Sequence, residues 1–283
     1  MGCAFPEGEQ GFNMGRIVGL LADLPISVAG VTVNRFCGSS MQSIHIAAGA
    51  IQMNAGEAFI CAGVESMSRI PMGGFNPMPN ADLFEKNEGA YMSMGETAEN
   101  LAEKYQIPRE EQEALAISSH AKAAAAREDG KFKSEIVPID CDGEIVDQDG
   151  CIRTGTNAED LAKLEPAFDA EGTVTAGTSS PLTDGASAVL ITTEDYAQAN
   201  NLEVLARIKS AAVAGCQPEI MGYGPVVSSV KALERAGISM SDIDVIELNE
   251  AFAVQALACV RELTIDLDKM KLDGGAIALG HPL

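Results

Sequence analysis

The sequence is poor in basic residues, in long apolar runs and in paired cysteines, and each shortage argues against a class of protein. Its 19 Lys and Arg residues stand against 41 Asp and Glu residues, so the formal net charge is −22 at pH 7. Duplex nucleic acid is therefore not expected as a partner, because such binding depends on Lys and Arg side chains that neutralise phosphates. An anionic small molecule remains compatible with the sequence where basic residues cluster locally.

No apolar run reaches the roughly 18 residues that a membrane-spanning helix needs. The N-terminal segment also lacks the basic region followed by an apolar stretch that is typical of a signal peptide. The seven cysteines are an odd number and include no Cys-x-x-Cys pair, which favours neither a disulfide framework nor a zinc site. We therefore expect no membrane span, no metal, and a reducing, cytoplasmic location.

The 283 residues are 46% hydrophobic, enough to build one large or two ordinary domains. The first candidate site lies in Val31–Ser40, which reads VTVNRFCGSS. This segment predicts a short strand, Met41–Ile51 predicts a helix and Ala58–Gly63 predicts a second strand, together the size of a βαβ unit. Cys37 then lies where the strand turns into the helix, and the backbone N–H groups and helix dipole there favour a thiolate. That placement is typical of a cysteine nucleophile, although a free cysteine is more often a small buried hydrophobe.

Helical spacing and apolar runs predict further elements along the chain. Predicted helices span Phe12–Leu24, Thr97–Tyr105, Glu110–Glu128, Pro225–Ala236 and Ala251–Leu263. Predicted strands span Ala188–Thr192, Val204–Val213, Val245–Leu248 and Met270–Leu272. We expect loops at Pro71–Asn80 and Gly172–Gly185, and a polar, hairpin-like segment at Lys131–Cys151. The alternation of strands and helices argues for an α/β sheet that is covered on both faces.

A thiol nucleophile needs a base, and the sequence has only three histidines. His45 would lie about 12 Å from Cys37 along the same helix, out of hydrogen-bond reach. His120 falls beside Lys122 on a predicted helix and is interpreted as a solvated surface residue. His281 follows the Gly-flanked stretch GGAIALG, so elimination favours it as the base, although a lone histidine is more often structural.

A weak internal echo lays Val245–Leu263 on Asn34–Ile51. It places Asn249 and Glu250 at the same strand-to-helix corner that Cys37 occupies in the first half. Two such corners from related halves could face each other across one site.

Five stretches occur in order along the chain: VNRFCGSSMQ, GTVTAGTSSPLTDGAS, MGYGP, LNEAFA and GGAIALGHPL. Together they resemble the thiolase family, the acyl-CoA C-acyltransferases, and the resemblance covers essentially the whole chain. It implies an α/β thiolase fold of two similar αβαβαββ halves, with central mixed sheets covered by helices and an inserted loop or lid domain. Residues 1–70 and 167–200 would form the N-terminal half, 71–166 the lid, and 201–283 the C-terminal half.

The resemblance also implies a reaction. Thiolases cleave 3-ketoacyl-CoA with free coenzyme A to acetyl-CoA and a shortened acyl-CoA, or run the reverse condensation. By similarity Cys37, deprotonated by His281, attacks the 3-keto carbon and becomes acylated, and its backbone N–H forms part of the oxyanion hole of the acyl-enzyme. His281 and a water held by Asn249 would bind the oxygen of the leaving enolate. Coenzyme A is thus a co-substrate, and no permanently bound cofactor is implied.

Further residues match positions that contact the coenzyme in the family. Ser180 matches a serine on the pantetheine arm, and Arg153 matches a basic residue near the adenine. Met94, Met221 and Phe252 match the walls around the thioester, with ordinary packing as the alternative for the two methionines.

Three features depart from the usual family pattern. Ser93 stands where members of the biosynthetic type usually carry histidine, which favours the degradative type that resembles fatty-acid β-oxidation thiolases. Asp273 stands where asparagine is more common before Gly-Gly. The family's first strands and its second catalytic cysteine, in a Cys-x-Gly turn, would lie outside Met1–Leu283. The resemblance therefore predicts a chain that is shortened at both ends and inactive as given.

Other interpretations remain open. A ketoacyl synthase would pair its cysteine with two histidines, and Asn249 fills one of those places here. A Cys–His protease would leave LNEAFA and the Gly-Thr-Ser loop without a role. A short-chain acetyl-CoA acetyltransferase that makes acetoacetyl-CoA and a non-catalytic CoA-binding protein are the alternatives that we retain. Thiolases are usually dimers or tetramers, so we expect a homodimer or homotetramer, with a hydratase/dehydrogenase subunit of a β-oxidation complex as a further partner.

Overall fold

The computed structural model describes every residue from Met1 to Leu283. The chain divides into two compact units. Unit 1 comprises Met1–Met78, Leu182–Ala211 and Pro282–Leu283, and unit 2 comprises Pro79–Pro181 and Ala212–His281. This division follows the density of contacts and differs in its bounds from the two halves and lid that the resemblance implies, which stay a prediction.

The centre of unit 1 is a ladder between strands β1 (Ala58–Ser66) and β4 (Asp184–Thr192). The two strands are antiparallel, and their register pairs Ala58 with Thr192 and Ser66 with Asp184. Both strands were expected from their apolar runs, and both extend beyond the predicted bounds. Alternate residues of β1 are buried, which is the pattern of a strand with one face on a core.

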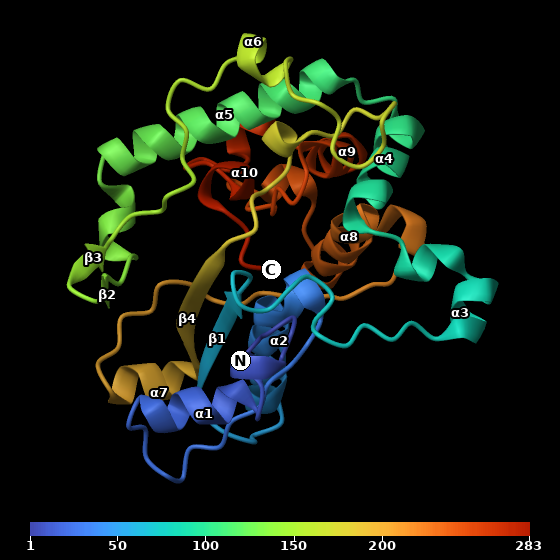
Figure 1. Cartoon of the computed structure of the whole chain (residues 1–283). Helices are drawn as coiled ribbons and strands as arrows, with labels where there is room; N and C mark the ends of the chain where they lie inside the picture. Colours follow the sequence, from blue (N-terminus) through green and yellow to red (C-terminus); the bar gives the residue numbers. More distant parts are fainter. The chain divides into compact units, whose positions relative to one another are not determined.

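The predicted helix and second strand of the strand–helix–strand unit are present in unit 1, whereas the predicted first strand in Val31–Ser40 reduces to a single bridge at Val33. Gly2 forms parallel bridges to Gly63 of β1 on one side and to Val33 on the other. Helix α2 (Ser39–Gln52) connects the segment at Val33 to β1 (Figure 1). The sheet therefore mixes parallel and antiparallel neighbours, as the fold class requires. The remaining elements of unit 1 are α1 (Met14–Leu21), α7 (Glu194–Ala199) and the 3-10 turns η1 (Gly8–Gln10) and η2 (Phe36–Gly38).

A buried carboxylate ties the N-terminal segment to the end of β1. The Glu65 side chain is 1% exposed and accepts hydrogen bonds from the backbone N–H of Ala4 at 2.6 Å and of Phe5 at 3.2 Å. The Gln10 amide donates a third at 2.6 Å. Because a buried carboxylate is costly unless its lone pairs are used, these donors fix the segment in place.

Unit 2 is mainly helical. Its longest helices are α4 (Met94–Tyr105), α5 (Arg109–Glu128), α8 (Gly224–Ala236) and α9 (Ala253–Leu263). Shorter elements are α3 (Ala81–Lys86), α6 (Ala158–Leu161), α10 (Ala276–Leu279), the hairpin of β2 (Ile139–Cys141) and β3 (Glu144–Val146), and 3-10 turns that include η4 (Lys131–Ser134), η5 (Ala176–Thr178) and η6 (Pro218–Tyr223). The predicted long helices and the hairpin are confirmed, with ends that differ by a few residues.

Helix α9 is the core of unit 2. Seven consecutive residues, Ala253–Cys259, are buried, so the helix has no solvent-facing side over its first two turns. Such all-round burial is typical of a central helix. Helices α4, α5 and α8 pack against it, and its Val254 and Leu257 belong to a buried apolar cluster with Leu101 of α4 and Ile220 of η6.

Three further predicted strands are wrong. Val204–Val213 does not form a strand, and Val204 and Leu205 are 62% and 88% exposed. Val245–Leu248 and Met270–Leu272 reduce to one parallel bridge between Ile246 and Met270. The apolar, β-branched composition that predicted these strands is present, but a strand also needs a hydrogen-bonded neighbour along its length, which local composition does not report.

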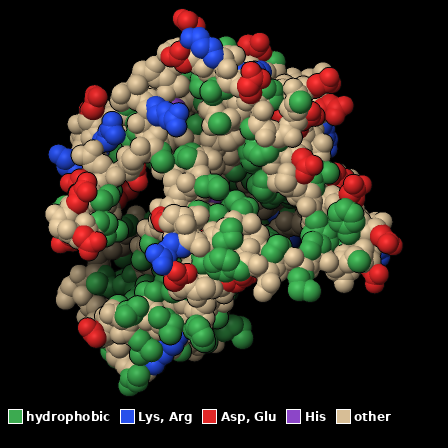
Figure 2. All heavy atoms as spheres, viewed as in Figure 1, with side chains coloured by type: hydrophobic (Ala, Val, Ile, Leu, Met, Phe, Trp, Pro, Cys, Tyr) green, Lys and Arg blue, Asp and Glu red, His purple; other side chains and the backbone are tan.

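The surface reflects the charge balance of the sequence. On the face seen in Figure 2, acidic side chains outnumber basic ones and are scattered over many elements. None of the helices combines the length and the apolar character that a bilayer crossing requires.

Candidate active site

Cys37 lies in the turn η2, two residues before Ser39, the first residue of α2, as the sequence predicts. Side chains hold this turn closed: Ser39 accepts a hydrogen bond from the Arg35 N–H at 2.8 Å and donates one to the Phe36 carbonyl at 2.6 Å. Phe36 has a φ of +45°, a left-handed conformation that a bulky aromatic residue rarely adopts. Backbone strain of this kind persists where the surroundings enforce it, often at functional sites. The Cys37 side chain is exposed.

The environment of Cys37 does not by itself favour a thiolate, contrary to the expectation from the helix N-terminus. Although part of its side chain reaches solvent, the protein atoms packed around the Cys37 sulfur desolvate it and raise the pKa of the thiol above its usual value, and the negative charge of Glu65 raises it further. The backbone N–H of Cys37 acts in the opposite direction. Since the raising effects prevail, Cys37 favours the thiol form, and a nucleophilic Cys37 would need a base.

Unit 2 gathers three of the predicted site residues on adjoining segments. The Ser180 N–H and hydroxyl both donate to the Ala251 carbonyl, at 3.0 and 3.1 Å, two residues after Asn249. The His281 N–H donates to the Pro181 carbonyl at 3.2 Å. Ser180, Asn249 and His281 come from distant parts of the sequence and are linked here by backbone hydrogen bonds. Asn249 is exposed, at the point where the chain turns toward α9.

His281 has the properties of a base. Burial lowers the pKa of its imidazole below the usual value, so the ring is neutral at pH 7. Its Nε2 atom is buried and has no hydrogen-bond partner. A buried polar atom without a partner is costly, and such atoms are common where a ligand or reacting group completes the site.

Glu250 is a functional candidate that the sequence left without a role. Its carboxylate is 1% exposed and accepts hydrogen bonds from the Ser119 hydroxyl at 2.7 Å and from the Ile277 N–H at 3.3 Å. These two hydrogen bonds tie the Asn249 corner to α5 and to Ile277 of α10, which lies four residues before His281. Burial raises the pKa of Glu250. Hydrogen bonds from Ser119 and Ile277 and the positive charges of Lys271 and Lys122 partly offset this rise.

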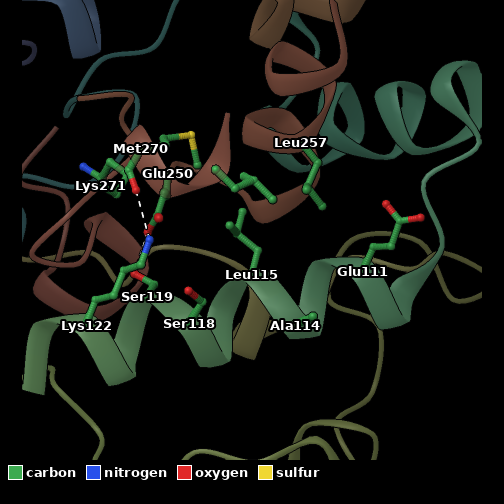
Figure 3. Close-up of a pocket in the computed structure, with 11 residues that line it drawn as sticks. Glu111, Ala114, Leu115, Ser118, Ser119, Lys122, Glu250, Leu257, Met270 and Lys271 are labelled. Atoms are coloured by element: carbon green, nitrogen blue, oxygen red, sulfur yellow. Dashed lines mark hydrogen bonds between the residues drawn. The ribbon is translucent and has the colours of Figure 1, made fainter. Parts of the chain in front are cut away.

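Glu250 also borders a cavity of ≈ 260 Å³ within unit 2, together with Leu115, Leu257 and Met270. Figure 3 shows Leu115, Ser119 and Lys122 rising from α5 toward it, with the Lys122 ammonium donating to the Met270 carbonyl at 3.0 Å. Each of these polar groups has a partner, so the cavity is best explained by packing between α5 and α9.

The other predicted residues are all in unit 2. Phe252 is 8% exposed and packs edge-on against Phe168, with ring centroids 5.7 Å apart. Met94 packs half-buried against the same cluster, whereas Met221 is 37% exposed. Ser93 is the N-cap of α4 and forms a capping box with Glu96, so this marker residue has a structural task as well.

The surface assignment of His120 is wrong. Its side chain is 6% exposed, and its Nδ1 accepts a hydrogen bond from the Arg153 N–H at 3.2 Å. The helical spacing of Ala116, His120 and Ala123 on the buried face of α5 was the signal available in the sequence. Arg153 is exposed beside a cavity of ≈ 430 Å³ that His120 and Ser179 also line.

Comparison with known proteins identifies the family to which this fold and these residues belong. The family descriptions "Thiolase, N-terminal domain" and "Thiolase, C-terminal domain" match residues 1–195 and 202–283. The chain belongs to the thiolase family, as its five motifs predict.

Relatives and solved structures agree with this placement. The chain is 49% identical over 296 residues to the 3-ketoacyl-CoA thiolase of Bacillus subtilis and 52% identical over 295 residues to that of Shewanella baltica. It is covered completely in both comparisons and spans 76% and 75% of those proteins. The structure of human mitochondrial 3-ketoacyl-CoA thiolase matches with a TM-score of 0.91 at 39% identity, and covers 100% of this chain and 75% of its own. A CoA complex of the human enzyme matches with a TM-score of 0.90.

Proposed function

We propose that Cys37, His281 and Asn249 are the groups through which this thiolase cleaves 3-ketoacyl-CoA. The function itself follows from the family: the chain is an acetyl-CoA C-acyltransferase that uses coenzyme A, like the relatives named 3-ketoacyl-CoA thiolase. The observation that best supports the residue roles is the buried, unpartnered Nε2 of a neutral His281.

The two pKa directions favour one order of proton transfer. Cys37 holds its proton because its pKa is raised, and His281 is free to accept one because its pKa is lowered. The resting pair is therefore a neutral thiol and a neutral imidazole. The proton moves to His281 as the sulfur attacks, which is general-base activation of a nucleophile.

The reaction then divides into two acyl transfers. The Cys37 sulfur adds to the 3-keto carbon, and the bond between the α-carbon and that carbon breaks, with its electrons going to the acetyl-CoA enolate. The enolate carbon takes its proton from the family's second catalytic cysteine, which the resemblance places in a Cys-x-Gly turn outside Met1–Leu283, and acetyl-CoA leaves. The resulting thiolate takes the proton of the CoA thiol as the CoA sulfur attacks the acyl-Cys37 thioester. The shortened acyl-CoA is released, and protonated His281 returns its proton to the Cys37 sulfur.

The negative charge of the enolate needs donors that are already oriented. Asn249, on an exposed corner fixed by Glu250, is suited to hold a water against the thioester oxygen, and protonated His281 supplies a second donor. Fixed donors at a developing oxyanion are usually the largest single contribution to catalysis.

The coenzyme would lie along unit 2. Ser180 faces the pantetheine arm, Arg153 the nucleotide end, and Met94, Met221 and Phe252 the acyl thioester. Ser93 in place of the biosynthetic histidine favours the degradative type, with medium or long 3-ketoacyl-CoA cleaved at least as well as acetoacetyl-CoA. A cytoplasmic homodimer or homotetramer, with a hydratase/dehydrogenase subunit as a further partner, belongs to the same proposal.

Acyl-enzyme trapping tests the role of Cys37. The full reading frame, which extends Met1–Leu283 at both ends, is expressed, incubated with 3-ketoacyl-CoA without free CoA, digested, and mapped by mass spectrometry. We expect the acyl mass on Cys37 and on no other cysteine. Cys141 is the control for access because it is also exposed, whereas burial raises the pKa of Cys3 to about 12 and that of Cys259 to about 11. Acylation of Cys141 or Cys216 in place of Cys37 would disprove the assignment.

A further inference from the structure

His120 and Arg153 come together on one wall of the ≈ 430 Å³ cavity in unit 2. His120 belongs to α5, and Arg153 belongs to the irregular segment before α6. The same cavity is lined by Asn157, Asp160 and Ser179. None of the proposed chemical steps uses His120. Its imidazole is only 6% exposed, and burying a polar ring costs free energy that an apolar side chain at this position would not cost.

The hydrogen bond between them fixes the state of the imidazole. A backbone N–H can only donate, so the Nδ1 of His120, 3.2 Å from the Arg153 nitrogen, must hold its lone pair. The Arg153 carbonyl is held as well, because the Thr156 hydroxyl donates to it at 2.8 Å. On the far side, Asn157 caps α6 by accepting from the Asp160 N–H at 3.0 Å. The turn that carries Arg153 is thus anchored at one end by α6 and at the other by His120.

We propose that neutral His120 is a positioning residue for coenzyme A: it holds the backbone of Arg153 so that the guanidinium meets the phosphate-bearing nucleotide end of the coenzyme. This inference rests on the proposed function, in which Arg153 faces that end. Protonation of Nδ1 removes the acceptor and places a second positive charge beside Arg153. The Arg153 turn is then released, and the enzyme loses affinity for the nucleotide end while its chemistry at Cys37 is unaffected.

The surroundings support a neutral ring. Burial lowers the pKa of His120 below its usual value, and the positive charge of Arg153 lowers it further. The acceptor form therefore persists through neutral pH and is lost only as the pH falls below about 6.5, the ordinary value for histidine. Titratable or charged groups near the cavity are Cys151, Arg153, Glu159 and Asp160. Of the elements packed on α5, η4 carries Lys131 and Lys133, α9 carries Cys259, Arg261 and Glu262, and η5 and α10 carry none. Lys122 lies on α5 itself, and Glu250 meets α5 through the Ser119 hydroxyl.

The first test separates substrate binding from chemistry. Cleavage of acetoacetyl-CoA is compared with cleavage of acetoacetyl-pantetheine, which lacks the nucleotide end. His120→Ala should raise KM for the CoA substrate about five- to tenfold, the effect of losing one hydrogen bond that orients a charged group, and leave kcat within about twofold. The pantetheine substrate should be unaffected. His120→Asn should restore most of the KM, because the Asn Oδ1 can accept from the Arg153 N–H. His45→Asn, a histidine of α2 in unit 1, is the matched control.

The second test uses the unaltered protein and its pH profile. KM for acetoacetyl-CoA should rise as the pH falls below 6.5, whereas KM for acetoacetyl-pantetheine stays level. The CoA phosphate itself titrates near pH 6, but this contribution persists in His120→Asn, so only the difference between the two proteins reports on His120. Equal losses on both substrates, or an identical acid rise in His120→Asn, would overturn the positioning role. All proteins compared are extended at both ends to the full reading frame, because Met1–Leu283 alone is expected to be inactive. A full-length wild-type protein that cleaves neither substrate would instead overturn the proposed function.

Discussion

Each unit of the molecule contains one carboxylate that is 1% exposed, Glu65 in unit 1 and Glu250 in unit 2, and the two are stabilised differently. Glu65 accepts from the N–H groups of Ala4 and Phe5 and from the Gln10 amide, so three nitrogen donors surround it. Glu250 accepts from one hydroxyl and one backbone N–H, and burial raises its pKa. The first carboxylate joins the N-terminal segment to the end of β1, and the second lies next to Asn249 in the sequence.

The difference shows how one side-chain type serves two purposes. A carboxylate with several N–H donors works as a permanent anchor because its charge is compensated. A carboxylate with fewer donors, in a site that favours the neutral form, holds its neighbours less firmly and responds to pH. In unit 1 the anchored carboxylate fixes the N-terminal segment to β1, while in unit 2 the carboxylate beside Asn249 has a raised pKa.

The largest expected effect comes from removing the nucleophile or the base. Cys37→Ala and His281→Ala should each lower kcat about 10³-fold or more, because covalent catalysis and the proton transfer that drives it are lost together. If the two residues act as a unit, the double variant should be no slower than the slower single variant. Cys141→Ala is the control. Multiplicative losses in the double variant would show that the residues of the two units act independently.

Asn249→Ala should lower kcat roughly 10²- to 10³-fold with little change in KM, because the water that it holds acts mainly on the enolate-like transition state. Steady-state kinetics with 3-ketoacyl-CoA measure the split. A near-normal kcat would mean that another group holds the water, and the resemblance of the two corners would lose its functional meaning.

Removing the two carboxylates should weaken the units unequally. Glu65→Ala leaves three buried donors without an acceptor and should cost about 3 kcal/mol or more, whereas Glu250→Ala strands fewer donors and should cost about 1–3 kcal/mol. Hydrogen exchange read peptide by peptide assigns the loss of protection to unit 1 or unit 2. Equal and global loss in both variants would contradict the distinction drawn between them.

The smallest effect is a difference in pH dependence. The raised pKa of Glu250 contributes stability that is present below its unfolded value near 4.3 and is lost as the pH rises toward its folded value. Asp184 of unit 1 behaves in the opposite way, because hydrogen bonds from Ser68 and Ser66 lower its pKa. The stability that Asp184 contributes to the protein is therefore lost as the pH falls through the pKa of Asp184 in the folded state.

Urea unfolding between pH 3 and 7 distinguishes the two carboxyls. Glu250→Gln should flatten the fall in stability on the neutral side, and Asp184→Asn should flatten the loss on the acid side. Parallel pH curves for both variants and the wild type would mean that neither carboxyl has a shifted pKa.

Much of this architecture could be predicted from the sequence because it is local. The 3.6-residue spacing of apolar residues located α4, α5, α8 and α9, and the strand-to-helix corner located Cys37. The contacts that define the site are not local. His120 depends on Arg153, 33 residues away, and Glu250 depends on Ser119, 131 residues away. Spacing along one helix reports which side is buried but not which distant group meets it. His120 was therefore predicted to be a surface residue, and Glu250 received no role.

The strain at Phe36 and the direction of the Cys37 pKa were missed for a related reason. The helix N-terminus alone favours a thiolate, but Glu65, 28 positions further along the chain, contributes an opposing charge. Electrostatic effects of this kind depend on the three-dimensional neighbourhood, and here the neighbourhood outweighs the local rule.

The ladder between β1 and β4 has a consequence for synthesis of the protein. Ser66 and Asp184, which hydrogen-bond to each other across its end, are 118 residues apart, and most of the intervening chain folds into unit 2. At roughly 5–20 residues per second, the ribosome needs on the order of ten seconds to supply the second strand after the first has emerged. During that interval β1 presents an open edge to other chains. The yield of folded protein should therefore depend on translation speed and chaperone supply over the stretch between the two strands more than over any other part of the message.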